Sequence, residues 1–410
     1  MEKELSFDAK ILHKPYAKTD AYGALNMPIY QSAAYEFDTA ESMEAAFIGK
    51  SADHTYSRIT NPTVQHFESR VQSITDALSV TALNSGMAAI SNIIITLAQS
   101  GSNIVTSRHL FGNTYSFFAS TMAAFGVETR FCDLTNPYEV ESHIDSNTCA
   151  VFLEIITNPQ LEIADLKALS AITKQMGVPL IADTTIVPFC AFKAKKWGIN
   201  IEIVSSTKYI SGGATSLGGL IIDYGNFDWL SSPKLHTVAK GFGPAAFTVK
   251  LRKEIHRNLG AYMTPQVAYM QNLGLETLSI RYECQSGTCL ELTKRLEKVG
   301  AIASVNYTGL ATNKYHELSL EQFGQKPGAM FTIDLASREA CFNFLNKLKI
   351  IKRATNLFDN KSLAIHPAST IFGTFTADDR KDMNVSDNTI RFSVGLESVD
   401  DLFNDIIQAL

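Results

Sequence analysis

The sequence predicts an α/β protein with a doubly wound, mostly parallel sheet, preceded by an N-terminal arm and followed by a smaller α+β domain. Short apolar runs alternate with helical segments between residues 61 and 250, which is typical of a sheet with helices on both faces. Residues 1–60 lack a long periodic segment, and the pattern changes again in residues 251–410. A chain of 410 residues is long enough for two or three such parts.

The first 60 residues are expected to form an arm that contacts a neighbouring subunit. Pro15, Gly23 and Pro28 interrupt any regular pattern, and tyrosines, among them Tyr16, are unusually frequent. An aromatic-rich segment without its own core gains stability by packing on another surface. The segment is therefore expected to wrap another surface, and a second subunit of a homo-oligomer is the candidate.

The central elements follow in order. A helix is expected to begin at Asn61-Pro62, because asparagine caps a helix and proline suits its first position. Further helices are expected from residue 85, at 113–125 and at 165–176, and the last two end at glycines. The expected strands are 77–83, 103–107, 127–132, 149–154, 179–182, 199–204 and 217–223.

The last 160 residues predict a different architecture. They contain a helical stretch at 265–299, an apolar run at 328–335 and a further helix near 338–348. We place the boundary near residue 250.

Composition excludes several functions. The net charge of −5 and the lack of a Lys/Arg run argue against nucleic-acid binding, and no apolar run approaches the roughly 18 residues of a membrane span. The six cysteines are scattered and the charged N-terminus has no apolar leader core, so reduced thiols in a cytoplasmic protein are expected. The histidines and cysteines show no metal-ligand spacing, so no metal site is expected.

Polar residues of the types that catalyse reactions or bind ligands follow several expected strands. Lys208 lies in a hydroxyl- and glycine-rich stretch after the strand 199–204, Asp183 ends another, Asn158 follows a third, and Ser85–Met87 begins a helix after a fourth. In open α/β sheets the carboxyl ends of the strands form the ligand site. Each residue alone is adequately explained as a cap, a turn or a solvated charge. Together they match a pyridoxal phosphate site, which needs an amine, a carboxylate for the ring nitrogen and a helix N-terminus for the phosphate.

One rival interpretation comes from the same lysine. Ser205-x-x-Lys208 and Ser386-Asp-Asn388 are two of the three elements of penicillin-recognising serine acylases. The third, a Lys-Thr-Gly strand, is absent from the sequence. This remains a remote alternative.

At these residues the chain resembles the cysteine and methionine metabolism family of pyridoxal phosphate enzymes, along nearly its whole length. The segments that carry the resemblance are Tyr56–Thr63, Ser85–Ala89, Asp183–Thr185, Ser205–Tyr209, His366–Ser369 and Ile390–Glu397. The resemblance implies the fold type I transferase architecture, a shared-site dimer, and a tetramer built from such dimers.

Matching positions imply the roles of individual residues. Lys208 would carry the cofactor as a Schiff base and then move protons, Asp183 would pair with the ring nitrogen, and Asn158 would bind the ring hydroxyl. Arg391 would bind the substrate carboxylate, helped by Asn356. The phosphate would be held by Gly86, Met87, Ser205 and Thr207, with Tyr56 and Arg58 reaching it from the neighbouring subunit.

Within the family, the chain resembles the O-acetylhomoserine sulfhydrylases. Gly274–Arg281, Asn356 and Asn113 carry this likeness. It implies replacement of the acetate of O-acetylhomoserine by sulfide or a thiol, giving homocysteine or methionine. A lyase acting on cystathionine, methionine or cysteine, a cystathionine γ-synthase, and a scaffold without turnover remain alternatives.

The chain departs from the family's residue pattern at three places. Phe111 occupies the position of the usual ring-stacking tyrosine, so stacking survives but a phenol does not. Tyr56 is then the expected acid. Phe358 replaces a usual glycine, and Ile371–Gly373 replaces a common Thr-His pair, so we expect an altered substrate entrance.

Overall fold

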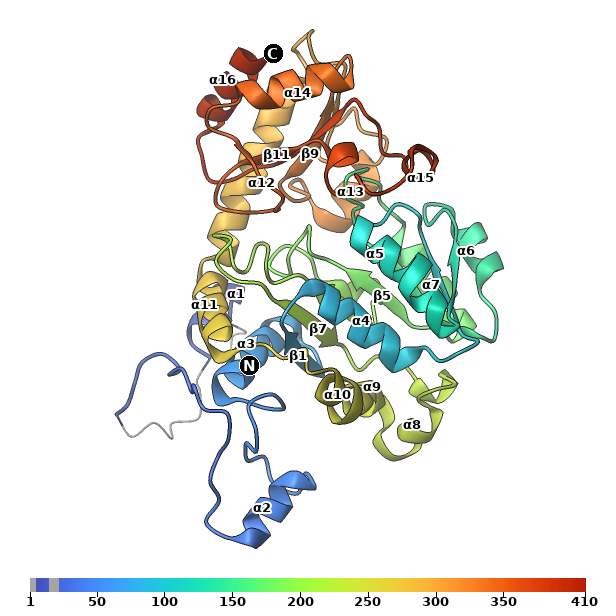
Figure 1. Ribbon diagram of the computed structural model, residues 1–410, viewed down its shortest axis with the longest axis vertical. Helices are drawn as coiled ribbons and strands as arrows, with labels where there is room; N and C mark the ends of the chain where they lie inside the picture. Colours follow the sequence, from blue (N-terminus) through green and yellow to red (C-terminus); the bar gives the residue numbers. More distant parts are fainter. Residues whose placement is uncertain (1–4, 15–21) are drawn as a thin grey trace.

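The computed structural model describes residues 5–14 and 22–410 (Figure 1). Part of the expected arm, including Tyr16, therefore lies outside the described residues. A seven-stranded sheet occupies the middle of the molecule with helices on both faces, and a five-stranded sheet lies at one end (Figure 1). The predicted α/β class is confirmed.

The large sheet has the order β1-β7-β6-β5-β4-β2-β3. Only β7 runs antiparallel to its neighbours, while the other four pairings are parallel. No helix lies between β6 and β7, and a parallel return would need such a crossover. The strands are β1 (Ser79–Leu83), β2 (Asn103–Thr106), β3 (Glu128–Phe131), β4 (Thr148–Glu154), β5 (Leu180–Asp183), β6 (Ile201–Val204) and β7 (Gly219–Asp223).

The core lies on both faces of this sheet because successive strand residues point to opposite sides. In β4, Ala150 and Phe152 pack into one apolar cluster with α4 (Gly86–Leu97), and Val151 and Leu153 pack into another with α3 (Pro62–Thr75) and α7 (Leu166–Met176). Asn61 caps α3 with its side chain, as the Asn-Pro pair predicts. Both faces of the sheet are thus packed against helices.

The remaining helices of this part are short. The expected helix at 113–125 is a helical stretch of mixed type, formed by α5 (Gly112–Ser116), the π-helix η1 (Phe117–Met122) and the 3-10 helix η2 (Ala123–Phe125). It ends at Gly126 with φ +75°. The other helical elements before residue 260 are α1 (Phe7–Leu12), α2 (Ala40–Phe47), α6 (Pro137–His143), η3 (Ala194–Trp197), η4 (Trp229–Ser231), α8 (His236–Phe242), η5 (Gly243–Ala245), α9 (Ala246–Lys250), η6 (Leu251–His256) and α10 (Arg257–Leu259).

The C-terminal part contains the five-stranded sheet β10-β11-β12-β9-β8. The expected helical stretch at 265–299 divides at Thr277 into two helices. The elements are α11 (Pro265–Glu276), α12 (Leu278–Leu296), β8 (Ser304–Asn306), α13 (His316–Phe323), β9 (Met330–Asp334), α14 (Arg338–Lys347), β10 (Lys352–Arg353), β11 (Leu363–Ile365), η7 (Pro367–Ser369), α15 (Ala377–Asp382), β12 (Thr389–Ser393) and α16 (Val399–Ala409).

We propose the division of the chain into an arm (1–60), a cofactor domain (61–250) and a C-terminal domain (251–410). Its support is that all strands of the large sheet precede residue 250 and all strands of the small sheet follow it. Helix α2 of the arm buries none of its residues, which agrees with an arm that packs on a second subunit.

Over the described residues, no helix is both long enough and apolar enough to cross a membrane.

Candidate active site

A cavity of about 350 Å³ lies between the large sheet and the C-terminal part. Parallel strands β4, β5 and β6 end beside it, as expected for a ligand site in an open α/β sheet. The cavity brings together residues singled out in the sequence, from both parts of the chain. Among them are Ser85, Gly86, Met87, Phe111, Asn113, Asn158, Asp183, Ser205, Thr207, Lys208, Asn356, Ile371 and Arg391.

Lys208 reaches the cavity from the turn that follows β6. Its Nζ donates a hydrogen bond to Asn356 Oδ1 at 2.8 Å. Burial and the nearby charge of Arg391 lower the pKa of Lys208 to about 8, although Asp183 acts in the opposite direction. A lysine with a lowered pKa has more uncharged amine near neutral pH and is a better nucleophile.

Asp183 ends β5 and extends into the same cavity. Its Oδ1 accepts the backbone N–H of Thr185 at 2.9 Å, which orients the carboxylate. Burial raises the pKa of Asp183, while Thr185 and Lys208 act to lower it. Such a carboxylate gains most from a cation inside the cavity, and a protonated ring nitrogen is one.

The N-terminus of α4 forms one wall of the cavity. Ser85 caps the helix by accepting the N–H of Ala88 at 3.0 Å, and the N–H groups of Gly86 and Met87 lie in the first turn, where anions are favoured. A Cβ on Gly86 would stand 2.9 Å from Ser205 Cβ, so only glycine allows this close approach. Main-chain donors and the hydroxyls of Ser205 and Thr207 thus line one cradle, which fits the phosphate of pyridoxal phosphate.

Arg391 lies on β12 and is almost completely buried, with 3% of its surface exposed. Its Nη1 donates to Asn158 Oδ1 at 3.0 Å and its Nη2 to the Asn356 carbonyl at 3.3 Å. Its Nε has no hydrogen-bond partner within the described part of the chain. Burial lowers the pKa of Arg391 to about 9. An unpaired donor on a buried guanidinium favours binding of a carboxylate.

Sequence reasoning missed Glu154 as a cavity residue. It ends β4 next to Asp183 on β5, and its Oε1 accepts the backbone N–H of Phe111 at 2.7 Å. The signal was present, because a carboxylate that ends an apolar run is the same feature that identified Asp183.

Tyr56 and Arg58 do not line this cavity. Arg58 donates to the Arg257 carbonyl and lies over the Tyr56 ring at 5.5 Å, and Tyr56 is 41% exposed. Ser386, part of the serine acylase interpretation, is exposed and also lies outside the cavity, so it cannot act there together with Ser205.

Among residues 5–14 and 22–410, no group of three or more His, Cys, Asp or Glu side chains is placed to hold a metal ion.

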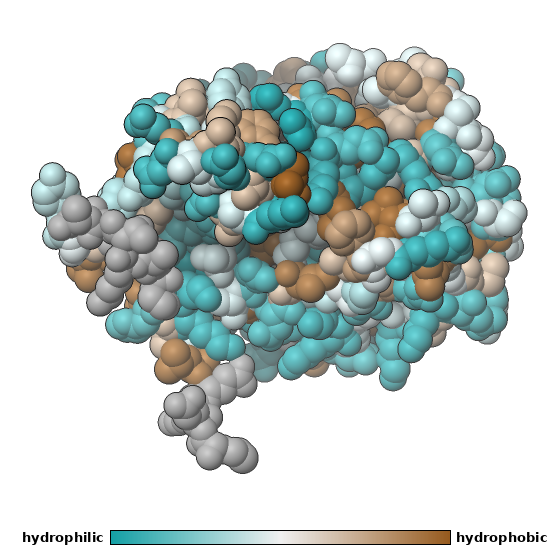
Figure 2. Space-filling view, turned by 90° about the horizontal axis from the view of Figure 1, so that it is seen from below, coloured by the Kyte–Doolittle hydropathy of each residue, from teal (hydrophilic) through white to brown (hydrophobic). Residues whose placement is uncertain are grey.

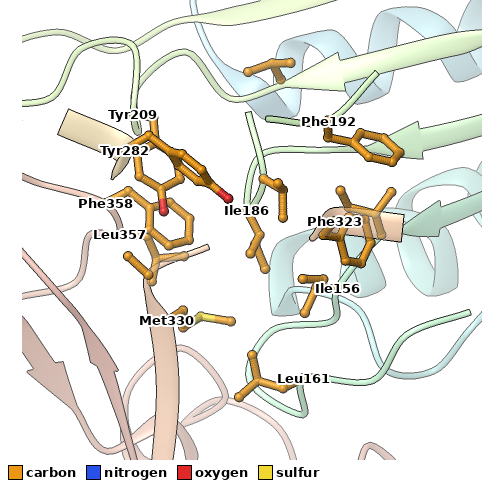
Figure 3. Packing of buried hydrophobic residues seen from close by; sticks show 14 of the residues in the cluster. Ile156, Leu161, Ile186, Phe192, Tyr209, Tyr282, Phe323, Met330, Leu357 and Phe358 are labelled. Carbon is orange, nitrogen blue, oxygen red and sulfur yellow. The ribbon is translucent and has the colours of Figure 1, made fainter. Parts of the chain in front are cut away.

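Phe358 is a buried residue next to Leu357, which lines the cavity. Its backbone is left-handed with φ +56°, a conformation in which glycine is far less strained. Its buried ring stacks on Tyr209, the residue after Lys208, with centroids 4.2 Å apart and ring planes at 6° (Figure 3). The stack holds the chain segments of Lys208 and Asn356 together.

We expect Phe358→Gly to lower the free energy of unfolding. Losing a buried aromatic side chain costs about 3–5 kcal/mol, and relief of the left-handed backbone returns about 1–2 kcal/mol. The net loss of about 1–4 kcal/mol is measured by urea unfolding. Phe358→Leu is the control, because it keeps most of the volume and all of the strain. A glycine variant as stable as the natural protein would show that relief of the backbone strain fully offsets the loss of the stacked ring.

Comparisons with known proteins agree with this geometry. Residues 8–410 match the family model described as Cys/Met metabolism PLP-dependent enzyme. The chain is 35% identical to O-acetyl-L-homoserine sulfhydrylase 1 of Thermus thermophilus, covering 99% of this chain and 100% of that one. It is 31% identical to the homocysteine/cysteine synthase of Kluyveromyces lactis, covering 97% and 96%.

Solved structures give the same result. A Campylobacter jejuni protein described as a candidate O-acetylhomoserine (thiol)-lyase superposes with a TM-score of 0.91 at 30% identity over 99% of both chains, and it contains a pyridoxyl-lysine. An O-acetylhomoserine sulfhydrylase of Wolinella succinogenes superposes with a TM-score of 0.77 at 42% identity, covering 86% of this chain and 99% of the other.

Proposed function

The chain belongs to the Cys/Met metabolism family of pyridoxal phosphate-dependent enzymes, and on this premise we propose that it exchanges the acetate of O-acetylhomoserine for sulfide or a thiol. The products are acetate and homocysteine, or methionine when the thiol is methanethiol. The observation that carries the proposal is that Lys208 lines one cavity together with Asp183 and Arg391, and that the charges of both act on its amine. Relatives named for this activity cover the whole chain.

The family's cofactor, when bound, supplies a protonated ring that accepts electrons from the substrate's Cα. Asp183 would keep the ring nitrogen protonated, and Asn158 would bind the ring hydroxyl. Gly86, Met87, Ser205 and Thr207 would hold the phosphate.

Lys208 would bind the cofactor and then move a proton at Cα and Cβ of the substrate. At pH 8 about half of such an amine is uncharged, because burial has lowered its pKa to about 8. Proton transfer by a positioned side chain contributes about 10²–10⁴-fold to the rate.

Arg391 and Asn356 would orient the substrate. The buried guanidinium suits a carboxylate, and its unpaired Nε offers a further donor. Asn356 Oδ1 already accepts a hydrogen bond from the Lys208 amine. The Asn356 side-chain amide is therefore within reach of a group bound to that amine.

A second copy of the chain would complete the site. Tyr56 and Arg58 lie outside the cavity of their own chain, so a shared-site dimer would let them reach the partner's phosphate. Tyr56 would also supply the phenol that Phe111 lacks. Helix α2, at the lower end of the molecule in Figure 1, supports such contact, because its Met43 and Phe47 are about half exposed (48% and 53%). Seen from below, the surface of the molecule mixes hydrophobic and hydrophilic residues (Figure 2). A tetramer would form from two such dimers.

We place the enzyme in the cytoplasm. All six cysteines lie in the described part of the chain and are free thiols, and free thiols persist in a reducing compartment.

A substrate panel tests the reaction. With O-acetylhomoserine and sulfide we expect homocysteine and acetate in equal amounts, and no 2-oxo acid or ammonia when cystathionine, methionine or cysteine is the sole substrate. The panel includes succinyl- and phospho-homoserine, with cysteine and methanethiol as alternative donors. Ammonia release from cystathionine or methionine at the rate of the sulfide reaction would make the protein a lyase, and faster reaction with cysteine than with sulfide would make it a cystathionine γ-synthase.

A further inference from the structure

Glu154 is a cavity carboxyl group that none of the roles above uses. It is 9% exposed and lies at the last position of β4, at the edge of the sheet where the cofactor would bind. A carboxyl group in such a place is costly unless it has partners.

Two backbone N–H groups act on its carboxyl group, those of Phe111 and Asn158. Glu154 Oε1 accepts the Phe111 N–H at 2.7 Å, and Phe111 is the residue before α5, which begins without a side-chain cap. The hydrogen bond therefore ties the backbone of Phe111, at the start of α5, to the end of β4.

Asp183 is the neighbour of Glu154 across the sheet. The two residues pair in register on parallel strands β4 and β5, and such strands lie about 4.8 Å apart. Burial, followed by the negative charge of Asp183, raises the pKa of Glu154 to about 8, and the N–H groups of Phe111 and Asn158 act against this. A neutral Glu154 leaves Asp183 as the only negative charge of the pair, since two adjacent buried carboxylates do not both ionise readily.

We propose that Glu154 is a positioning residue of the cofactor site, which anchors the backbone of Phe111 so that its ring stacks on the cofactor held by Asp183 and Lys208. The inference rests on the proposed function only for the identity of the cofactor. It does not depend on which substrate the enzyme uses.

Three variants at this position and one control test the proposal. Glu154→Gln keeps an oxygen that accepts the Phe111 N–H, Glu154→Ala removes it, and Glu154→Asp withdraws it by one methylene. Glu202→Gln is the control, because Glu202 is a completely buried carboxyl group on β6 of the same sheet, bonded to Thr184 and Tyr224 outside the cavity.

The readouts are the dissociation constant of pyridoxal phosphate, from titration of the apoenzyme, and the absorption maximum of the bound cofactor. Glu154→Gln and Glu202→Gln should stay within about threefold of the natural protein, whereas loss of a hydrogen bond worth about 1–3 kcal/mol predicts roughly 5–150-fold weaker binding in Glu154→Ala. Among Glu154→Gln, Glu202→Gln and Glu154→Ala, only Glu154→Ala should shift the absorption maximum of the bound cofactor, because in this variant the Phe111 ring is no longer held against the cofactor ring.

If the alanine variant does not fold, the aspartate variant replaces it, with an expected loss of at least about fivefold. Natural affinity and spectrum in the alanine or aspartate variant would overturn the proposal, as would an equal loss in Glu202→Gln. A natural protein that binds no pyridoxal phosphate at all would instead refute the proposed function.

Discussion

Lys208→Ala is expected to reduce turnover of O-acetylhomoserine with sulfide by at least about 10⁴-fold, since it removes both the amine that would bind the cofactor and the group that would move the protons. Within the described part of the chain, the Lys208 side chain makes one hydrogen bond, from its amine to Asn356 Oδ1 at 2.8 Å. Alanine leaves the turn after β6 intact, so the loss should be chemical. Thermal unfolding checks that the variant is folded.

The control is Lys240→Ala, which removes an exposed lysine of α8 and should keep full activity. Adding methylamine to Lys208→Ala should restore part of the rate, because a free amine can take over the proton transfer. Full activity in Lys208→Ala would contradict the proposal that Lys208 binds the cofactor and moves the protons.

Asp183→Asn should lower turnover by about 10²–10⁴-fold, because asparagine keeps the shape of the side chain and removes the charge that would hold the ring nitrogen protonated. The Oδ1 that accepts the Thr185 N–H at 2.9 Å can still do so in asparagine, so the orientation should survive. The measurements are kcat, KM and the dissociation constant of the cofactor. The loss should appear mainly in kcat.

Asp223→Asn is the matched control. Asp223 is a buried carboxylate on β7 of the same sheet, bonded to Thr248 and Gly225, and it does not line the cavity. Its variant should lose stability without losing kcat in the folded fraction. Equal kcat in Asp183→Asn and the natural protein would show that the ring nitrogen needs no charged partner here.

The sequence was most informative where periodicity and burial coincide. The apolar runs at 149–154 and 199–204 correspond to β4 and β6, and Asn-Pro at residue 61 begins α3. The direction of β7 was not predictable, because an apolar run has the same composition whichever way it points, and only the lack of a crossover helix makes it antiparallel.

Short elements escaped detection. The strands β8 and β10 have three and two residues, too few to show an alternation of apolar and polar side chains. Their positions come from pairing with β9 and β11, which is tertiary information. The helix expected at 113–125 changes type at Phe117 for a reason that its own sequence does not display.

The site followed from one rule, that polar residues at strand ends meet at one edge of the sheet. That rule brought Asp183, Asn158 and Lys208 into one cavity, and the same rule applied to Glu154 would have found it. Arg391 needed the resemblance to known enzymes, because it lies on the other sheet, more than 180 residues from Lys208 in the sequence. The roles of Tyr56 and Arg58 stay predictions, since a single chain does not bring them to the cavity.

The central claim is that Lys208 carries pyridoxal phosphate in this cavity, and chemical mapping tests it most directly. The purified protein is reduced with borohydride, digested and sequenced by mass spectrometry. We expect one pyridoxyl phosphate label, on the peptide that contains Lys208, and no label there in Lys208→Ala. A label on any other lysine, or none in a protein that turns over O-acetylhomoserine, would contradict the account.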